Sequence, residues 1–309
     1  MRYLVTGGAG FIGSHLVDRL LSLGNKVVVV DDLSSGRLQN LNKGAVFYHT
    51  SINHPSIEEI IQREQPDIIN HHAAQISVSE SVRDPVKDAE INIQGTIRLA
   101  ELARRYGIVK FILASSGGTL YGEPEENPCN EQHPIRPLSP YGLSKSSAER
   151  YLEMYYQTYR LNYVTLRYGN VYGPRQDPHG EAGVIAIFAK AMLEGKQPRI
   201  FGTGEQERDF VYIDDVVDAN VAAMEDGHGE YNVGTGHATS VSRIFQMLKG
   251  IIKYKWDPIY GPARPGEVFS VSLDSTKLEK GLDWMPKQDL EEGLRLTAKY
   301  FQESLKEQN

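Results

Sequence analysis

The sequence predicts an α/β fold in which helices cover both faces of a doubly wound parallel sheet. Short apolar stretches alternate with helix-like stretches through the first half of the chain, as they do when a crossover helix follows each strand. The first apolar stretch, Tyr3 to Val5, ends in a glycine-rich turn that leads directly into a helix-like stretch. The second, Lys26 to Asp31, is mostly valine and ends in an acidic residue, as expected of a strand buried on both faces.

The remaining elements follow in order. Further short apolar stretches predict strands at Ala45 to His49, Ile68 to His71, Lys110 to Ala114, Asn162 to Arg167 and Tyr231 to Val233. Amphipathic stretches predict helices over Asp84 to Tyr106, Pro140 to Leu161 and Asp214 to Met224. Gly107 ends the first of these helices, and Ser139-Pro140 supplies a cap and a first-turn proline for the second.

The glycine-rich turn is the first candidate site. Gly7, Gly10 and Gly13 are spaced as in turns that bring a helix N-terminus close to a bound diphosphate. Asp31 follows 18 residues after Gly13, near the place where a carboxylate accepts hydrogen bonds from an adenosine ribose. That carboxylate would repel the 2'-phosphate of NADP, so the pattern favours NAD, with Arg37 close enough in sequence to soften the repulsion. We therefore predict a Rossmann-type, NAD-binding sheet.

Composition limits the other function classes. The 309 residues are 40% hydrophobic and 24% charged with a net charge of -7, and they contain no basic cluster suited to nucleic acid or an anionic membrane. The single cysteine, Cys129, cannot form an internal disulfide, no Asn-x-Ser/Thr sequon occurs, and residue 1 already begins a strand instead of a signal peptide. We expect a cytoplasmic protein without nucleic-acid or membrane partners. No metal site is predicted, because the adjacent His71 and His72 point to opposite faces of a strand.

The second candidate site is a tyrosine and a lysine near the start of a predicted helix. Tyr141 and Lys145 are four residues apart, so both lie on one helix face and can reach one pocket. Because a free tyrosine has a pKa near 10, a tyrosine base at neutral pH needs a pKa lower by roughly three units. Lys145 and an oxidised nicotinamide ring, both positive, can supply that shift. The Ser115-Ser116 loop would lie nearby, at the carboxyl edge of the sheet.

These motifs belong to a set of segments spread over nearly the whole chain. They are Thr6-Gly-Gly-Ala-Gly-Phe-Ile-Gly13, Asp31-Asp-Leu-Ser-Ser-Gly36, His72-Ala-Ala74, Asn92, Tyr141-x3-Lys145, Arg167-Tyr-Gly-Asn170, Arg208-Asp209 and Arg264-Pro-Gly-Glu267. With them the sequence resembles the extended short-chain dehydrogenase/reductase family and, within it, the UDP-glucose 4-epimerases (UDP-galactose 4-epimerases). The resemblance implies an isomerase in which Tyr141 removes the proton of the sugar 4-hydroxyl while hydride passes from C4 to tightly held NAD. The 4-keto sugar then turns over and takes the hydride back, while Lys145 holds the nicotinamide ribose and keeps Tyr141 acidic.

The same resemblance implies which residues surround each ligand. Around NAD they are Gly7, Gly10, Phe11, Ile12, Gly13, Asp31, Asp32, Ser35, Gly36, Ser51, Ile52, Ala73, Ala74, Asn92, Ser115, Tyr141, Lys145 and Tyr168. Around the UDP-sugar they are Ser116, Thr119, Tyr141, Asn170, Val184, Phe201, Arg208, Val241, Arg264, Glu267 and Val271. The forked donors of Arg208 and Arg264 suit the oxygens of a diphosphate. The helices Asp84 to Tyr106 and Pro140 to Leu161 resemble the pair through which family members form a four-helix bundle, so a homodimer is expected.

One loop departs from the family pattern. Family members carry a hydroxyl there that bonds the sugar 4-oxygen, but the register from Tyr121-Gly122 puts Gly117 at that place. Ser116 is the first candidate to replace it, because the two glycines that follow allow the loop to re-aim it, and Thr119 is the second. The alternative that Ser116 only satisfies backbone groups in a turn stays open.

Several reactions remain open as alternatives. The relatives include UDP-glucuronate 4-epimerases, UDP-N-acetylglucosamine 4-epimerases and nucleotide-sugar 4,6-dehydratases. Dehydratases need an acidic side chain in the Ser116 to Thr119 loop, which has none, although Glu123 lies just beyond. Val271 falls where family members limit the room around the sugar 2-substituent, and its intermediate size favours UDP-glucose and UDP-galactose over N-acetylated sugars. The retained Tyr141 and Lys145 speak against a non-enzymatic NAD-binding regulator.

Two domains are expected. After Tyr168 the chain becomes rich in glycine and proline loops, and it returns to strand-like sequence near residue 231. The NAD-binding Rossmann domain would comprise residues 1–168 with 213–236. A smaller C-terminal α/β substrate domain, for the nucleotide-sugar, would comprise residues 169–212 with 237–309.

Overall fold

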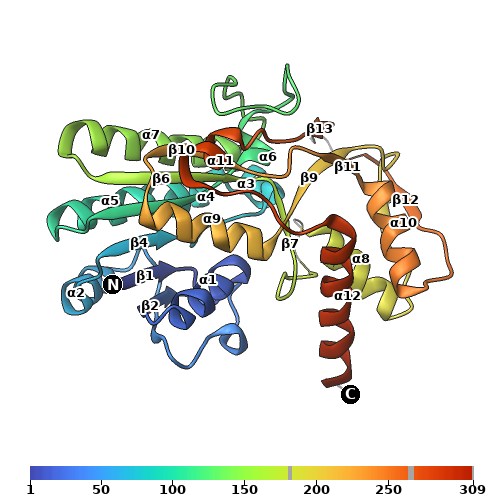
Figure 1. The fold of residues 1–309 in the computed structure, drawn as a ribbon, viewed down its shortest axis with the longest axis horizontal. Coiled ribbons are helices and arrows are strands. Elements are labelled where there is room, and N and C mark those ends of the chain that lie inside the picture. Colours follow the sequence, from blue (N-terminus) through green and yellow to red (C-terminus); the bar gives the residue numbers. More distant parts are fainter. Residues whose placement is uncertain (180–182, 264–267, 308–309) are drawn as a thin grey trace.

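A seven-stranded parallel sheet forms the larger part of the chain, with strand order β10-β6-β5-β4-β1-β2-β3 (Figure 1). The computed structural model describes residues 1–179, 183–263 and 268–307. The strands of this sheet are β1 (Arg2–Thr6), β2 (Lys26–Asp31), β3 (Val46–His49), β4 (Ile68–His71), β5 (Lys110–Ser116), β6 (Asn162–Tyr168) and β10 (Gly229–Val233). The order reverses between β1 and β4, so the predicted doubly wound fold is confirmed.

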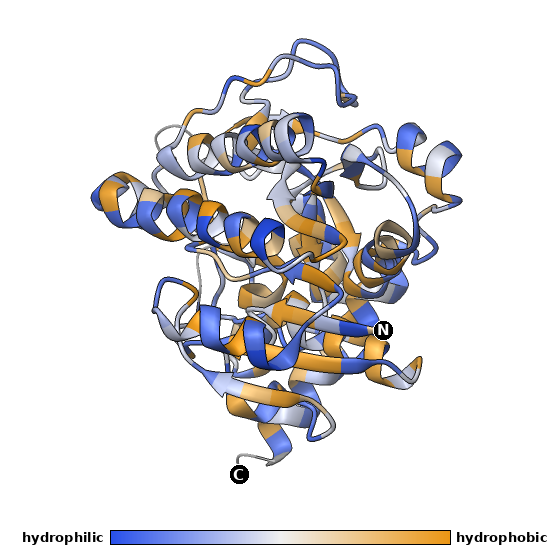
Figure 2. Cartoon of the chain, turned by 90° about the vertical axis from the view of Figure 1, so that its left-hand side faces the viewer, coloured by the Kyte–Doolittle hydropathy of each residue, from blue (hydrophilic) through white to orange (hydrophobic). Residues whose placement is uncertain are grey.

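Both faces of this sheet are buried. The helices that cover it are α1 (Phe11–Ser22) and α9 (Ile213–Glu225) on one face, and α2 (Ser56–Glu64), α5 (Gly95–Arg105) and α7 (Pro140–Tyr159) on the other. Side chains alternate between the two faces, as in any strand: Tyr3 and Val5 of β1 join the core under α1 and α9, while Leu4 joins the core under the other three helices. Figure 2 shows the strands largely in the hydrophobic colour between helices that are hydrophilic on one side.

The stretch predicted as one helix from Asp84 to Tyr106 is helical throughout, but a π-helical turn interrupts it. Its parts are α4 (Pro85–Ala89), η2 (Glu90–Gln94) and α5. The turn holds Asn92 in the interior, with 2% of its surface exposed. There the Asn92 side chain accepts a hydrogen bond from the Gln75 backbone and donates one back, which fixes the loop that follows β4. Turns of this kind are frequent at functional sites.

The chain after Tyr168 builds a smaller part beside the large sheet (Figure 1). Here β9 pairs with β7, β11 and β13, while β8 pairs with β12. The elements are β7 (Asn170–Tyr172), α8 (Val184–Leu193), β8 (Arg199–Phe201), β9 (Glu207–Tyr212), β11 (Ala238–Ser240), α10 (Val241–Ile252), β12 (Ile259–Gly261), β13 (Ser270–Val271), α11 (Thr276–Leu282) and α12 (Leu290–Glu307). The core of α8, α10 and α12 is continuous with the core under α1 and α9. The predicted boundaries of the two domains stay a prediction.

Short helices complete the described part of the chain. They are η1 (Leu38–Asn40), α3 (Val78–Arg83) and α6 (Gly117–Leu120). Among the residues with a described position, no helix is both long enough and apolar enough to cross a membrane. The same residues contain no group of three or more His, Cys, Asp or Glu side chains arranged to hold a metal ion.

Candidate active site

The carboxyl ends of β1, β4, β5 and β6 meet at one edge of the large sheet, where the strand order reverses. The register places Thr6 beside His71 and Ser116 beside Tyr168. In open α/β sheets ligands bind at this edge. The predicted ligand residues Gly7, Ala73 and Ser115 lie at or within two residues of these strand ends, so the fold gathers them in one place.

The glycine-rich turn is packed too tightly for side chains. Gly7 has a φ of +69°, and a Cβ on it would lie 2.6 Å from the backbone nitrogen of Ala73. A Cβ on Gly13 would lie 2.2 Å from the carbonyl oxygen of Gly7, so α1 begins directly against the turn. The cap residue Gly10 offers no side chain to the first N–H groups of α1, which therefore stay available for a diphosphate.

Asp31 ends β2 with its carboxylate held beside this turn. Its two oxygens accept hydrogen bonds from the backbone nitrogens of Ala9, at 2.9 Å, and Leu33, at 2.8 Å. Burial raises the pKa of Asp31, and these two bonds oppose that change. A Cβ on Gly36 would lie 2.6 Å from the carboxylate, so the backbone passes close by. Arg37 forms an exposed ion pair with Asp177 at 3.0 Å.

The other residues predicted around NAD lie on neighbouring segments. Phe11 and Ile12 begin α1, and Asn92 lies in the π-helical turn. Asp32 and Ser35 follow β2, whereas Ser51 and Ile52 follow β3. Ala74 follows β4, and Tyr168 ends β6, where its ring stacks on that of His72 with 6.4 Å between the ring centres.

Tyr141 and Lys145 lie on the first turns of α7. Ser139 caps this helix by accepting a hydrogen bond from Gly142, and the Tyr141 backbone nitrogen donates to the hydroxyl of Ser81 at 3.1 Å. The ammonium group of Lys145 lies 6.0 Å from the centre of the Tyr141 ring and donates to the Ala114 carbonyl at 3.0 Å. The helix thus brings both predicted groups to the end of β5.

Burial shifts the pKa values of Lys145 and Tyr141 away from their ordinary values. It lowers the pKa of Lys145 to about 8, although the carboxylates of Asp88 and Glu149 raise it. Burial also raises the pKa of Tyr141 to about 12, against a hydrogen bond from Ser116 that lowers it, while Asp88 raises it further. In this state of the site Tyr141 is a protonated phenol at neutral pH, and it needs further positive charge nearby to act as a base.

The packing around the loop after β5 explains why a glycine stands where family members carry a residue with a hydroxyl group. A Cβ on Gly117 would lie 2.5 Å from a methyl group of Leu273, a residue that is 1% exposed. Leu273 therefore takes the space that a side chain at position 117 would need. The Ser116 hydroxyl, one residue earlier, lowers the pKa of Tyr141, whereas the Thr119 hydroxyl is buried without a hydrogen-bond partner in the described structure.

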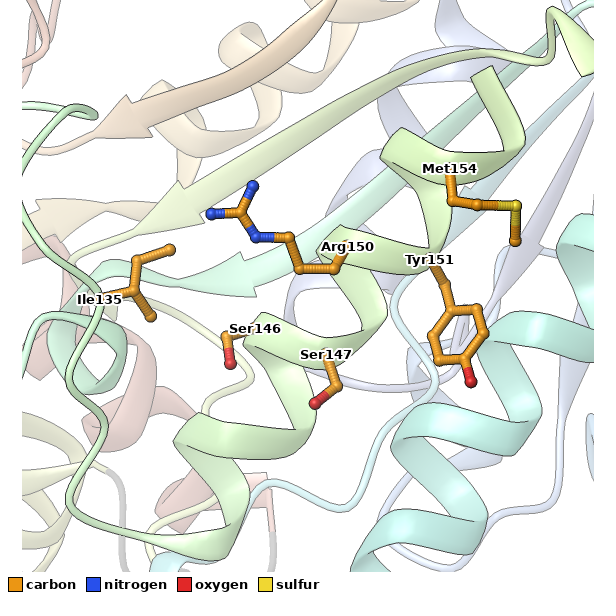
Figure 3. Close-up of a pocket in the computed structure, with 6 residues that line it drawn as sticks. All are labelled: Ile135, Ser146, Ser147, Arg150, Tyr151 and Met154. Carbon is orange, nitrogen blue, oxygen red and sulfur yellow. The ribbon is translucent and has the colours of Figure 1, made fainter. Parts of the chain in front are cut away.

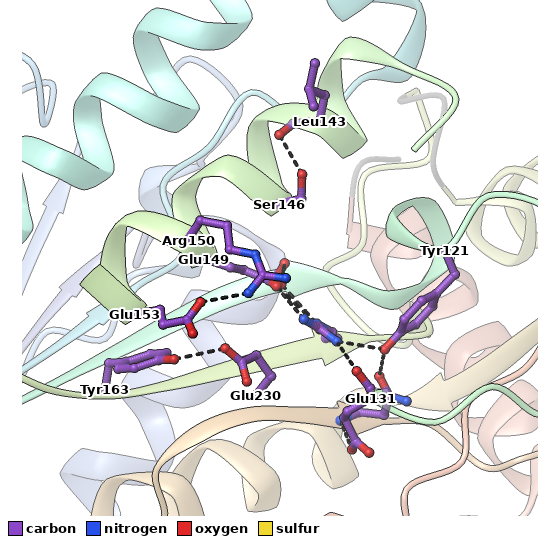
Figure 4. Close-up of polar contacts among 12 residues, drawn as sticks. Tyr121, Glu131, Leu143, Ser146, Glu149, Arg150, Glu153, Tyr163 and Glu230 are labelled. Atoms are coloured by element: carbon purple, nitrogen blue, oxygen red, sulfur yellow. Dashed lines mark hydrogen bonds and ion pairs between the residues drawn. The ribbon is translucent and has the colours of Figure 1, made fainter. Parts of the chain in front are cut away.

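A buried polar network supports this loop from behind. Glu149, one turn after Lys145, forms an ion pair with Arg167 at 2.7 Å, and both side chains are at most 4% exposed. The Ser115 hydroxyl donates to Glu149 at 2.6 Å, and Arg167 donates to the hydroxyl of Tyr121 at 3.1 Å (Figure 4). Burial raises the pKa of Glu149, and Arg167 opposes that change. Both ends of the loop that carries Ser116 are thus tied to one ion pair.

The predicted sugar and UDP residues come together only in part. The register of the small sheet places Val271 beside Arg208, and β7, which begins with Asn170, pairs with the same strand β9. Val271 is 2% exposed and packs with Tyr121 and Leu273. Val184 and Val241 begin α8 and α10, and Phe201 ends β8. Arg264 and Glu267 lie outside the described residues.

Sequence reasoning missed several residues of this site. Asp88 and Gln75 lie in segments without a recognisable motif, and Leu273 is close to Gly117 only in space. Glu149 could have been found, because it follows Lys145 by four residues and so lies on the same helix face.

A separate hollow lies on the outward face of α7. Its volume is about 500 Å³, and its lining residues are Ile135, Ser146, Ser147, Arg150, Tyr151 and Met154 (Figure 3). All except Ile135 come from α7. None of them belongs to the residues predicted to hold NAD or the UDP-sugar.

Comparison with known proteins places the chain among enzymes that act on nucleotide-sugars. The model of the NAD dependent epimerase/dehydratase family matches residues 3–234. The UDP-glucose 4-epimerase of Mycolicibacterium smegmatis is 46% identical over 308 residues, which are 97% of this chain and 98% of that protein. The crystal structure of a Thermotoga maritima UDP-glucose 4-epimerase with UDP-glucose is 51% identical, with a TM-score of 0.97 over 99% of this chain and 100% of that chain. A Thermus thermophilus UDP-glucose 4-epimerase in complex with NAD is 43% identical, with a TM-score of 0.94 over 97% and 99% of the two chains.

Proposed function

Because this chain belongs to the NAD dependent epimerase/dehydratase family, we propose that it is an isomerase that interconverts UDP-glucose and UDP-galactose. The observation that carries the proposal is the group at the carboxyl edge of the sheet. There the Lys145 ammonium lies 6.0 Å from the centre of the Tyr141 ring, and the Ser116 hydroxyl lowers the pKa of Tyr141. The enzyme would work in galactose and other carbohydrate metabolism.

The cofactor is NAD, and the residues present fit it. The turn at Gly7 and Gly13 has no room for side chains, so a diphosphate can approach the start of α1. Each oxygen of Asp31 accepts only one hydrogen bond in the described structure, so the carboxylate keeps lone pairs for the two hydroxyls of an adenosine ribose. When bound, NAD supplies an acceptor for hydride from C4 of the sugar and a positive charge near Tyr141.

Tyr141 is the proposed base. With Lys145 protonated, added positive charge lowers the pKa of Tyr141 from about 12 toward neutrality, because it stabilises the phenolate. Tyr141 then takes the proton of the sugar 4-hydroxyl, and Ser116 relays it and holds the 4-oxygen. The 4-keto sugar would turn over in the site, the hydride would return to C4 on the other face of the sugar, and Tyr141 would return the proton to the 4-oxygen.

The UDP part would lie against the small sheet. Arg208 lies on β9 beside Val271, and β7, which begins with Asn170, pairs with the same strand. Both residues are proposed to contact the UDP moiety, because a guanidinium suits a diphosphate. The other residues proposed to contact the UDP moiety are Phe201, Val184, Val241, Arg264 and Glu267.

Epimerisation is favoured over dehydration by the chemistry of the loop after β5. A dehydratase needs a carboxyl group next to the sugar for a further proton transfer. Glu123, the acidic residue nearest in sequence, is exposed, and its carboxylate accepts a hydrogen bond from the Phe269 backbone at 2.7 Å. It is therefore committed elsewhere.

One incubation tests this function. Purified chain is given UDP-galactose without added NAD, and the products are identified by chromatography and NMR. We expect UDP-glucose at equilibrium with UDP-galactose. A 4-keto-6-deoxy product would indicate a dehydratase. No conversion here, combined with conversion of UDP-glucuronate or UDP-N-acetylglucosamine, would indicate one of the other epimerases.

We further propose that two copies of the chain form a homodimer through a four-helix bundle. Large apolar side chains are exposed on the helices expected to form it: Val86, Leu143, Tyr151 and Met154, each at least 40% exposed. Those of α7 lie on one face, at i, i+8 and i+11, and two of them, Tyr151 and Met154, line the hollow of Figure 3. A second copy would cover this apolar face.

A reducing compartment such as the cytoplasm is proposed as its location. The only cysteine of the chain, Cys129, is buried, and its thiol donates to the Ser272 carbonyl at 3.2 Å. The fold therefore uses no internal disulfide.

A further inference from the structure

A buried carboxylate on α4 is connected by hydrogen bonds to the helix that carries the proposed base, and no ion pair of the described residues includes it. Asp88, near the end of α4, is 1% exposed. Its Oδ1 accepts hydrogen bonds from two neutral amides, Gln75 Nε2 at 2.8 Å and Asn92 Nδ2 at 3.0 Å. Its Oδ2 has no hydrogen-bond partner in the described structure. Aspartate is seldom fully buried unless something compensates its charge, so this residue needs an explanation.

Lys145 is the buried cation on which Asp88 acts. Asp88 and Glu149 both act on Lys145 to keep its ammonium charged against burial, and Asp88 has the larger effect. Glu149 already forms an ion pair with Arg167 at 2.7 Å, which neutralises its charge. Lys145 also acts on His71, which ends β4, and on His72, which follows it, but burial lowers the pKa of both, and that of His72 to about 3, so they are neutral at neutral pH. Of the two carboxylates that act on Lys145, Asp88 is therefore the one that no ion pair of the described residues includes.

The same carboxylate is also connected to the turn that carries Tyr141. The Asn92 amide that donates to Asp88 lies 3.2 Å from the Ser144 hydroxyl, and that hydroxyl donates to the Tyr141 carbonyl at 2.9 Å. The π-helical turn keeps Asn92 in this bridging place. One chain of hydrogen bonds therefore joins α4, η2 and the first turn of α7.

We propose that Asp88 is a positioning residue of the active site, which keeps Lys145 charged and, through Asn92 and Ser144, holds the turn of α7 that carries Tyr141. Its effect on turnover rests on the proposed function, but its effect on Lys145 does not. Asp88 raises the pKa of Tyr141 as well as that of Lys145. Ser116 lowers the pKa of Tyr141. Removing the charge of Asp88 should therefore lower the pKa of Tyr141 and the pKa of Lys145.

Asp88→Asn is the variant of choice. Asparagine has the same shape, its oxygen can still accept from Gln75 and Asn92, and its NH₂ group takes the place of the unpartnered Oδ2. The matched control is Glu90→Gln, which removes the same charge from an exposed residue two positions along the same helical segment. Asp88→Ser, also neutral, replaces the first variant if that one does not fold.

The first measurement is independent of activity. The pKa of Lys145 is about 8 in the folded chain and near 10.5 when unfolded, so the folded chain gains stability as pH rises through that window. With Asp88→Asn this rise should begin about one pH unit lower, the usual effect of one nearby opposite charge. The pH at which stability begins to rise is found by measuring the unfolding temperature of the cofactor-loaded chain from about pH 6 to about pH 9. In a Lys145→Met background, the change in unfolding temperature caused by Asp88→Asn should lose its pH dependence.

The second measurement is the pH profile of kcat for UDP-galactose. The acid limb of this profile reports deprotonation of Tyr141, and the alkaline limb reports deprotonation of Lys145. Both limbs should move to lower pH in Asp88→Asn and stay in place in Glu90→Gln. Parallel stability curves for Asp88→Asn and the natural chain would overturn the proposal, even if turnover fell. If the natural chain converts no UDP-galactose, the proposed function fails, while the stability curves still decide the role of Asp88.

Discussion

The Tyr141 hydroxyl is the group on which the proposed chemistry depends most directly. Replacing Tyr141 by Phe removes the proton acceptor and keeps the packing of the ring, so kcat for UDP-galactose should fall by at least about a hundredfold with NAD still bound. Tyr106→Phe is the matched control, because Tyr106 precedes Lys110 by the same four residues but is exposed and donates to Glu58. Near-normal turnover by the first variant would refute the assignment of the base.

The neighbouring hydroxyls can be ranked in the same way. The Ser116 hydroxyl lowers the pKa of Tyr141, whereas the Thr119 hydroxyl has no protein partner within the described chain. Ser116→Ala should lower kcat about a hundredfold, and Thr119→Val, which keeps the shape, by less than about tenfold. The opposite order in steady-state kinetics would make Thr119 the group that relays the proton.

Sugar choice is predicted at Val271. Its side chain is smaller than an aromatic ring but stiff and branched, so UDP-galactose should be preferred to UDP-N-acetylgalactosamine by about ten- to two-hundredfold in kcat/KM. Both substrates can be measured on one preparation. Val271→Ala should reduce the difference in kcat/KM between the two substrates. A preference of the natural chain for the acetylated sugar would contradict this interpretation.

At the scale of elements, the ion pair between α7 and β6 should be the strongest single link. Arg167→Met leaves Glu149 buried and unpaired, which should cost about 3–5 kcal/mol in the free energy of unfolding by urea. Adding Glu149→Leu should recover part of that loss. Arg150→Met, which breaks the exposed pair with Glu153, should cost at most about 1 kcal/mol, and an equal loss in both pairs would show that burial is not the cause.

Elements with a local pattern were predictable from the sequence. The strand Lys26–Asp31 has the predicted bounds, because its valine run and the acidic residue after it are contiguous. The π-helical turn around Asn92 was not predictable, since the apolar periodicity continues through it. Nor was the reason for Gly117, whose neighbour Leu273 lies far along the chain. Ligand contacts predicted from the family, such as those of Asp32 or Phe201, remain predictions.

At the scale of the whole molecule, the apolar face of α7 predicts assembly. Light scattering at micromolar concentration should give the mass of a dimer of the 34.6 kDa chain. Leu143→Glu places a charge on that face and should give a monomer. Leu23→Glu, at an exposed apolar residue just after α1, should leave the dimer intact. A natural chain that scatters as a monomer would remove the basis for the four-helix bundle.

The large sheet also constrains how the chain can fold during synthesis. Strand β10 pairs with β6 only after the chain has passed through β7, α8, β8, β9 and α9. Until residue 233 has left the ribosome, β6 remains an edge strand with unpaired backbone groups beside Ser116. The side of the sheet next to the catalytic loop is therefore among its last parts to be paired, and a nascent chain stalled before this point would offer β6 as a surface for chaperones or for aggregation.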